Sequence, residues 1–195
     1  GSLLCKEYYS ERSITNAKAR LKKLTTNGIL VCHHLNTEKK GPIPVYTLGP
    51  GGAKILETPF TPNWWEDMSA YKVLNQLTVN KLYSRLKEVA GSATYLPAPY
   101  PFYACIEVKG YNFLVTVTNK GKIPSDLYWE KDSRLIVICE SLEEIQDVAL
   151  SAKNPNIRYI TDYELFLIPM HEALIKYDYA TNALSFTKVN LFATE

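Results

Sequence analysis

The sequence predicts an α+β protein built from two domains. Apolar residues recur every three to four positions over 70–90, which is typical of an amphipathic helix, whereas RLIVICE (134–140) is an uninterrupted apolar run, typical of a buried strand. Residues 1–59 carry nine Lys or Arg and four Asp or Glu, a net +5, whereas the remainder carries 13 and 16, a net −3. The basic excess lies in one segment, so that segment alone is expected to meet a polyanion. We predict a basic domain over 1–57, a linker over 58–69 and an α/β domain over 70–195.

The composition is that of an ordinary globular protein. Hydrophobic residues make up 46% of the chain and charged residues 22%, so it can bury a core. The sequence contains no apolar run of about 18 residues and no signal-peptide core. These features predict a cytoplasmic protein without a membrane partner.

The chain has four cysteines and no C-x-x-C pair; they are Cys5, Cys32, Cys105 and Cys139. Cys105 and Cys139 lie in apolar, strand-like runs, where a free cysteine is usually a small buried side chain, so we expect reduced thiols. Cys32-His33-His34 contains metal-ligand residue types, but neighbours on a strand point to opposite faces and cannot converge on one ion. We therefore expect neither a metal nor a cofactor.

The stretch SITNAKARLKKLTTNG predicts a helix with a polar, basic outer face. Its apolar residues recur with spacings of three, four and three, which forms one helical stripe; they are Ile14, Ala17, Leu21 and Leu24. Ser13 is suited to cap the start of this helix, and Gly28 to end it in the left-handed conformation. The opposite face and its flanks contain no carboxylate; their residues are Thr15, Asn16, Lys18, Ala19, Arg20, Lys22, Lys23 and Thr26.

The neighbouring segments predict the element order of a winged helix-turn-helix. LLCKEYYS predicts a short helix upstream, ILVCHHL and VYTLG predict two strands, and GGAKILE predicts a further helix. The polar loop NTEKKGPIP joins the two strands. Gly41, Pro42 and Pro44 are expected to form its turn and to leave Lys39 and Lys40 at its tip.

The pattern ARLKKLTTNGIL…GPIPVYTLGPGGAKIL resembles the winged helix of PadR-type repressors and of the replication-relaxation family of plasmids and phages. The resemblance implies that the helix enters the DNA major groove while the wing follows the backbone. Its candidates for base edges are Thr15, Asn16 and Lys22, and its candidates for phosphates are Lys18, Arg20, Lys23, Lys39 and Lys40. Such domains have a helix before LLCKEYYS, so this domain is expected to lack its first helix.

The alternative for this domain is a protein-interaction or dimerisation module without DNA contact. The carboxylate-free helix face and the basic loop favour DNA. Trp64 and Trp65 lie in the proline-containing linker. We expect them to pack at the domain junction rather than stack on bases, because no basic cluster surrounds them.

The longest predicted helix, over 70–90, opens the second domain. Its broad apolar face consists of Leu74, Leu77, Val79, Leu82, Tyr83, Leu86, Val89 and Ala90. Its segment LNQLTVNKLYSRL resembles the stretch that follows the winged helix in the replication-relaxation family. PadR proteins end instead in a dimerising pair of helices, so this second match favours the former family.

The rest of the chain predicts a small α/β domain. FYACIEV and YNFLVTVT predict a hairpin, and RLIVICE and NIRYI predict parallel strands joined by a helix over SLEEIQDVALSA. Ser141 with Glu144, and Thr161 with Glu164, predict capping boxes at two helix starts. EALIKYD and ALSFTKV predict a final hairpin, whose exposed Tyr177 and Tyr179 suggest a dimer surface.

A helix, a hairpin and a β–α–β–α unit form the skeleton of the PD-(D/E)xK nuclease fold, which the second half of the replication-relaxation family resembles. IEVKG (106–110) supplies the Glu-x-Lys part of that signature. No aspartate or glutamate lies between Val89 and Ile106, and a single carboxylate is a poor Mg²⁺ site. A turn at Lys109-Gly110 also places Glu107 opposite Asn112. We expect a degenerate nuclease-like domain that is not an enzyme.

The sequence contains three other arrangements with a bearing on catalysis. A metal-dependent nuclease could combine Glu107 with Asp126 or Glu140. His171 and Glu172 are adjacent at the edge of the predicted final hairpin, so their side chains are expected to diverge. PGG at 50–52 precedes a helix but lacks the lysine and the spacing of a phosphate-binding loop.

The sequence thus predicts a non-enzymatic, DNA-binding regulator of replication, transfer or transcription of a plasmid or another mobile element. Its ligand would be double-stranded DNA, and it would act as a homodimer, with the second domain supplying dimerisation or a protein partner. The remaining alternatives are an adaptor without DNA contact and the metal-dependent nuclease.

Overall fold

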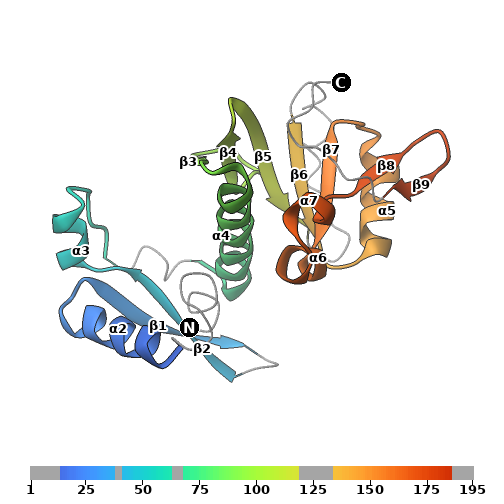
Figure 1. Cartoon of the computed structure of the whole chain (residues 1–195). Helices are drawn as coiled ribbons and strands as arrows, with labels where there is room; N and C mark the ends of the chain where they lie inside the picture. Colours follow the sequence, from blue (N-terminus) through green and yellow to red (C-terminus); the bar gives the residue numbers. More distant parts are fainter. Residues whose placement is uncertain (1–13, 38–40, 63–67, 119–133, 186–195) are drawn as a thin grey trace. The chain divides into compact units, whose positions relative to one another are not determined.

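The structure, a computed structural model, describes residues 14–37, 41–62, 68–118 and 134–185. The chain is of mixed α and β composition and divides into two compact units, Gly1–Val73 and Leu74–Glu195 (Figure 1). The predicted start of the first helix at Ser13, the upstream helix of LLCKEYYS, and Trp64 and Trp65 lie outside the described residues.

The first unit contains helix α2 (Ile14–Thr26), strands β1 (Leu30–Thr37) and β2 (Gly41–Leu48), and the short helix α3 (Pro50–Ile55). The predicted helix is confirmed, and Gly28 ends it with a φ of +66°, a conformation that costs glycine little. Strands β1 and β2 form an antiparallel ribbon of two strands.

The prediction that Gly41, Pro42 and Pro44 form a turn is wrong. All three belong to β2, where Pro42 pairs with Asn36 and Pro44 with His34. Both prolines occupy positions of the same parity, so their nitrogens point to the same side of the strand. In a ribbon of two strands that side is an open edge that requires no N–H donor.

Close backbone contact holds α3 against the turn between α2 and β1. The amide of Gly49 donates to the Ile29 carbonyl at 2.8 Å, and that of Gly51 to the Gly28 carbonyl at 3.0 Å. A Cβ atom at Gly49 or Gly52 would collide with these same carbonyl oxygens. The glycines of PGG and the preceding Gly49 therefore serve close packing of the backbone.

The second unit is built on one sheet of five strands in the order β3-β4-β5-β6-β7. Its strands are β3 (Thr94–Leu96), β4 (Ala104–Val108), β5 (Tyr111–Val117), β6 (Arg134–Cys139) and β7 (Ile157–Thr161). The first three strands are antiparallel, and β5, β6 and β7 are parallel. The hairpin, the buried strand and its parallel neighbour are as predicted, whereas β3 was not predicted.

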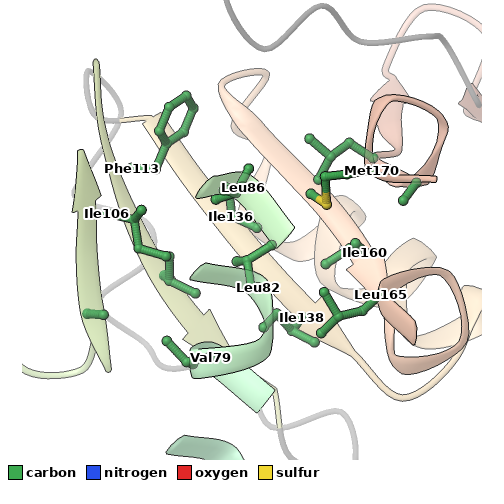
Figure 2. Packing of buried hydrophobic residues seen from close by; sticks show 14 of the residues in the cluster. Val79, Leu82, Leu86, Ile106, Phe113, Ile136, Ile138, Ile160, Leu165 and Met170 are labelled. Carbon is green, nitrogen blue, oxygen red and sulfur yellow. The ribbon is translucent and has the colours of Figure 1, made fainter. Parts of the chain in front are cut away.

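Helices cover both faces of this sheet. Helix α4 (Ala70–Ala90) packs Val79, Leu82 and Leu86 against one face, as Figure 2 shows. Helix α5 (Leu142–Ala152) packs Ile145, Val148 and Ala149 against the other face, as predicted. The apolar face of α4 is narrower than predicted, since three of its residues are exposed; they are Leu74, Leu77 and Val89.

Two predicted helix starts differ in how they are capped. At α6 (Asp162–Leu167) the capping box of Thr161 and Glu164 is complete, as predicted. At α5 the hydroxyl of Ser141 accepts from the Glu144 amide, but the Glu144 carboxylate accepts at 2.6 Å from the amide of Glu140. The second half of that predicted box is therefore wrong, because the carboxylate reaches one residue further upstream.

The last described elements are α7 (Met170–Ala173) and the hairpin of β8 (Lys176–Asp178) and β9 (Ala183–Ser185). His171 and Glu172 thus lie in a helix and not in the hairpin. Tyr177 and Tyr179, predicted to be exposed on a dimer surface, are not exposed. Tyr177 is only 2% exposed in the core on the α5 side, and the Tyr179 hydroxyl lies 3.2 Å from the carbonyls of Ala149 and Asn154.

Candidate nucleic-acid interface

The outer face of α2 presents a row of polar and basic side chains. Ala17, on the inner stripe, is only 1% exposed, and Leu21 and Leu24 are half-buried. Every predicted contact residue of the helix is exposed; they are Thr15, Asn16, Lys18, Arg20, Lys22 and Lys23. The other two, Lys39 and Lys40, lie outside the described residues.

The charge and length of this face suit a polyanion. The helix contains two neutral polar residues in its first turn, four cations after them and no carboxylate. Thr15 and Lys22 are seven residues apart, which is about 10 Å along the axis, roughly the rise of three base pairs. Thr26 is less available than its exposure suggests, because its hydroxyl donates to the Lys22 carbonyl at 3.0 Å.

The β1–β2 ribbon adds two residues that the sequence analysis did not select. His34 and Asn36 are exposed and alternate along β1, so they share one face of the ribbon next to the predicted tip. His33 points to the opposite face, where its Nε2 atom lies 2.8 Å from the Thr47 hydroxyl. The alternation in CHHLN was the signal that could have identified both residues.

The same alternation bears on the metal hypothesis for Cys32-His33-His34. Cys32 and His34 are on one face of the ribbon and His33 is on the other. Across the described part of the chain, no group of three His, Cys, Asp or Glu residues could hold a metal ion.

Glu107 lies on β4 as the sequence predicted. It pairs with Asn112 on β5 and with Thr94 on β3, and Lys109 and Gly110 form the turn with φ angles of 50° and 80°. Lys109 is therefore in the turn and not beside Glu107 on the strand. The strand that precedes β4 offers the hydroxyl of Thr94, not a carboxylate, opposite Glu107.

The other carboxylate proposed for a nuclease, Glu140, lies at the far end of the sheet. Glu107 is at the end where Phe113 pairs with Arg134, whereas Glu140 follows β6 at its opposite end. The six residue-to-residue steps from Arg134 to Glu140 extend over about 20 Å. The structure thus separates these two carboxylates, and Asp126 lies outside the described residues.

A separate group of carboxylates lies where β6 and β7 end. Burial first, and then the charges of Glu140 and Glu144, raise the pKa of Asp162. Nearby, burial raises the pKa of the Cys139 thiol to about 12, so this cysteine is protonated and unreactive at neutral pH. Cys32, Cys105 and Cys139 are all free thiols.

Comparison with known proteins gives no relative for this chain. No protein-family model, no curated protein and no solved structure matches it. Within the described residues, no helix is both long and apolar enough to cross a membrane.

Proposed function

We propose that this chain is a non-enzymatic, DNA-binding regulator whose first unit is a winged helix-turn-helix. The observation that carries the proposal is the exposed, carboxylate-free outer face of α2. The element order of helix, two-stranded ribbon and helix supports it, since this is the order in which a winged helix presents its recognition helix and its wing.

In this proposal α2 enters the major groove of duplex DNA. Thr15, Asn16 and Lys22 contact base edges, and Lys18, Arg20 and Lys23 contact phosphates on either side. Lys39 and Lys40 extend the contact along the backbone from the wing, where His34 and Asn36 lie on the adjoining strand. Phosphate contacts position the helix, and the base contacts give sequence preference.

The second unit is proposed to be a degenerate nuclease-like domain that serves partner binding. Its helix, hairpin and β–α–β unit, together with the segment LNQLTVNKLYSRL, support the resemblance to the replication-relaxation family. That resemblance suggests control of replication, transfer or transcription on a plasmid or another mobile element. The separation of Glu107 from Glu140 supports a role without cleavage.

Fluorescence anisotropy with random duplex DNA tests the proposal. The intact chain is expected to bind, and its affinity to fall steeply between about 50 and 200 mM salt as counterions are released. Replacing both Lys22 and Lys23 by Gln is expected to weaken binding and to reduce the salt slope by about one, because Lys23 is the phosphate contact of this pair. The matched control combines Lys87→Gln with Lys153→Asn, which removes two exposed charges from the second unit.

The outcomes separate the three candidate functions. If the Lys22 and Lys23 variant binds as tightly as the control, or if the intact chain does not bind at low salt, the protein is better explained as an adaptor. Cleavage of supercoiled plasmid in Mg²⁺ or Mn²⁺, abolished by Glu107→Ala, would instead establish the nuclease.

A further inference from the structure

Helix α6 of the second unit is apolar on both of its sides. Leu165 faces the sheet and is fully buried. On the opposite side, Tyr163, Phe166 and Leu167 are spaced by three and one, share a helical face and are 61%, 37% and 64% exposed. Large apolar side chains that lie together on a surface often mark an interaction site, so this outer side is expected to have an occupant.

The apolar surface continues from α6 onto α4. The ammonium of Lys81 lies 5.7 Å from the centre of the Phe166 ring, and Arg85 donates to the carbonyls of Leu165 and Ile168, so the two helices are neighbours. One turn before Lys81, Leu77 is 37% exposed, and Leu74 before it is 38% exposed. We call these five residues the α4–α6 face; they are Leu74, Leu77, Tyr163, Phe166 and Leu167.

The apolar area of the α4–α6 face is large enough to form the central part of a protein interface. At about 200 Å² for each large side chain, its exposed fractions amount to roughly 450 Å². This is within the range of the largest apolar patch on a monomer, which is often functional. It is also more than half of the about 800 Å² that each partner buries in an interface of standard size.

We propose that the α4–α6 face binds the same face of a second copy of this chain. In a two-fold dimer the face meets itself, so Leu74 and Leu77 of one copy can pack on the α6 residues of the other, and reciprocally. The rim of the face carries both signs, with Lys81 on α4 and Asp162 on α6, whereas a rim of one sign would repel its copy. The choice of a second copy rests on the proposed function, because two recognition helices would bind two half-sites.

Sedimentation velocity of the intact chain without DNA tests this proposal. The wild type is expected to sediment as a dimer, and Leu167→Glu, which would bury a charge within the face, to raise the dimer dissociation constant at least about 100-fold. Leu150→Glu is the matched control, because Leu150 is a 45% exposed leucine on α5, away from the face. It is expected to leave the dimer intact, and both variants should keep the far-UV circular dichroism spectrum of the wild type, which reports folding whether or not the chains associate.

Two results would overturn the proposal. A monomeric wild type would show that the α4–α6 face does not bind its own copy, and a dimer that survives both Leu167→Glu and Tyr163→Glu would place the interface elsewhere. Because mass is measured without DNA, these results are independent of the proposed function. A dimer that binds no duplex DNA would leave this interface standing and would reject the DNA-binding role.

Discussion

Three neighbouring tyrosines in the second unit differ in how their hydroxyl groups are satisfied. Tyr159 and Tyr177 are buried, and the Tyr177 hydroxyl has no hydrogen-bond partner in the part of the chain that the structure describes. Tyr179 donates instead to a backbone carbonyl, and its ring meets that of Tyr177 edge to face at 4.9 Å. A buried hydroxyl without a partner contributes a desolvation cost, so the ring is what stabilises the fold at Tyr177.

Removing the hydroxyl of Tyr177 and removing that of Tyr179 are expected to have different effects on the free energy of unfolding. Tyr177→Phe keeps the ring and deletes an unsatisfied group, so the free energy of unfolding should stay the same or rise. Tyr179→Phe deletes a donor and leaves the carbonyls of Ala149 and Asn154 without it, so that free energy should fall by about 1 kcal/mol. Urea denaturation followed by circular dichroism measures both. A larger loss for Tyr177→Phe than for Tyr179→Phe would contradict this account.

The short helix α6 depends on contacts at both of its ends. It has only six residues and could not persist in isolation. The capping box of Thr161 and Glu164 satisfies its first amides, and Arg85 of α4 donates to the carbonyls of Leu165 and Ile168 at its last turn, at 3.4 and 2.6 Å. A side chain of α4 thus caps α6. Because Arg85 and Leu165 are 80 residues apart, no local sequence pattern predicts this cap.

Arg85→Met is expected to destabilise the second unit by about 2 kcal/mol, because hydrogen bonds from charged groups are worth about 1.5–3 kcal/mol. Methionine keeps the apolar stem and loses both donors. Lys87→Met on the same helix is the control, since Lys87 is exposed and its loss removes the same charge. Chemical denaturation of the two variants gives the comparison. Equal midpoints for both would show that the cap contributes nothing.

Asp162, the first residue of α6, gives a prediction that depends on pH. Burial and the charges of Glu140 and Glu144 raise its pKa above the ordinary value of 3.8. The folded protein therefore holds this proton more tightly than the unfolded chain, so ionised Asp162 opposes folding. That penalty is complete above the folded-state pKa and disappears as the pH falls from there to about 3.8.

Asp162→Asn is accordingly expected to raise the melting temperature at pH 7, with a gain that shrinks towards pH 4. Thermal melts of the variant and the wild type across this range measure the gain. Asp147→Asn, at an exposed position of α5, controls for the loss of one negative charge. If the gain of Asp162→Asn were the same at every pH, ionisation of the Asp162 carboxyl would not be its cause.

Long periodic elements could be predicted from the sequence, whereas short or context-dependent ones could not. The spacing of apolar residues identified α2, α4 and α5, and the turn at Lys109-Gly110 followed from its residue types. Strand β3 has three residues, too few for an alternation to be recognised. The prolines of β2 indicated a turn in the sequence. They are tolerated in a strand because the ribbon has an open edge, and that edge is known only once the pairing of β1 with β2 is known.

The candidate interface was predictable in part for the same reason. Helical periodicity separates the exposed side of α2 from Ala17 without any knowledge of tertiary contacts. The position of His34 and Asn36 required the register of β1 with β2, and the burial of Tyr177 required its packing beneath α5. The environment of these residues is set by segments distant in the sequence, so local sequence patterns do not predict it.

At the scale of the whole molecule, the two units differ in the size of the hydrophobic side chains that they bury. Among the described hydrophobic residues of the first unit, only Ala17 and Ala53 are fully buried, at 1% and 2% exposure. The second unit buries large side chains on both faces of its sheet, among them Leu82, Ile136 and Tyr159. Burial of large apolar side chains dominates folding free energy, so the first unit should be the less stable of the two.

Hydrogen exchange is expected to resolve this difference and to connect it with the proposed function. Amides of α2, β1 and β2 should exchange faster than those of β6, whose residues Leu135–Cys139 are buried in the interior of the sheet. Duplex DNA that binds only the folded first unit should slow exchange there by mass action and leave β6 unchanged. Mass spectrometry of the intact chain, with and without DNA, measures the faster exchange of the first unit and its protection by DNA. The variant with Lys22→Gln and Lys23→Gln should keep the faster exchange and lose the protection by DNA. Protection by DNA that appeared in β6 and not in α2 would locate the DNA contact on the second unit.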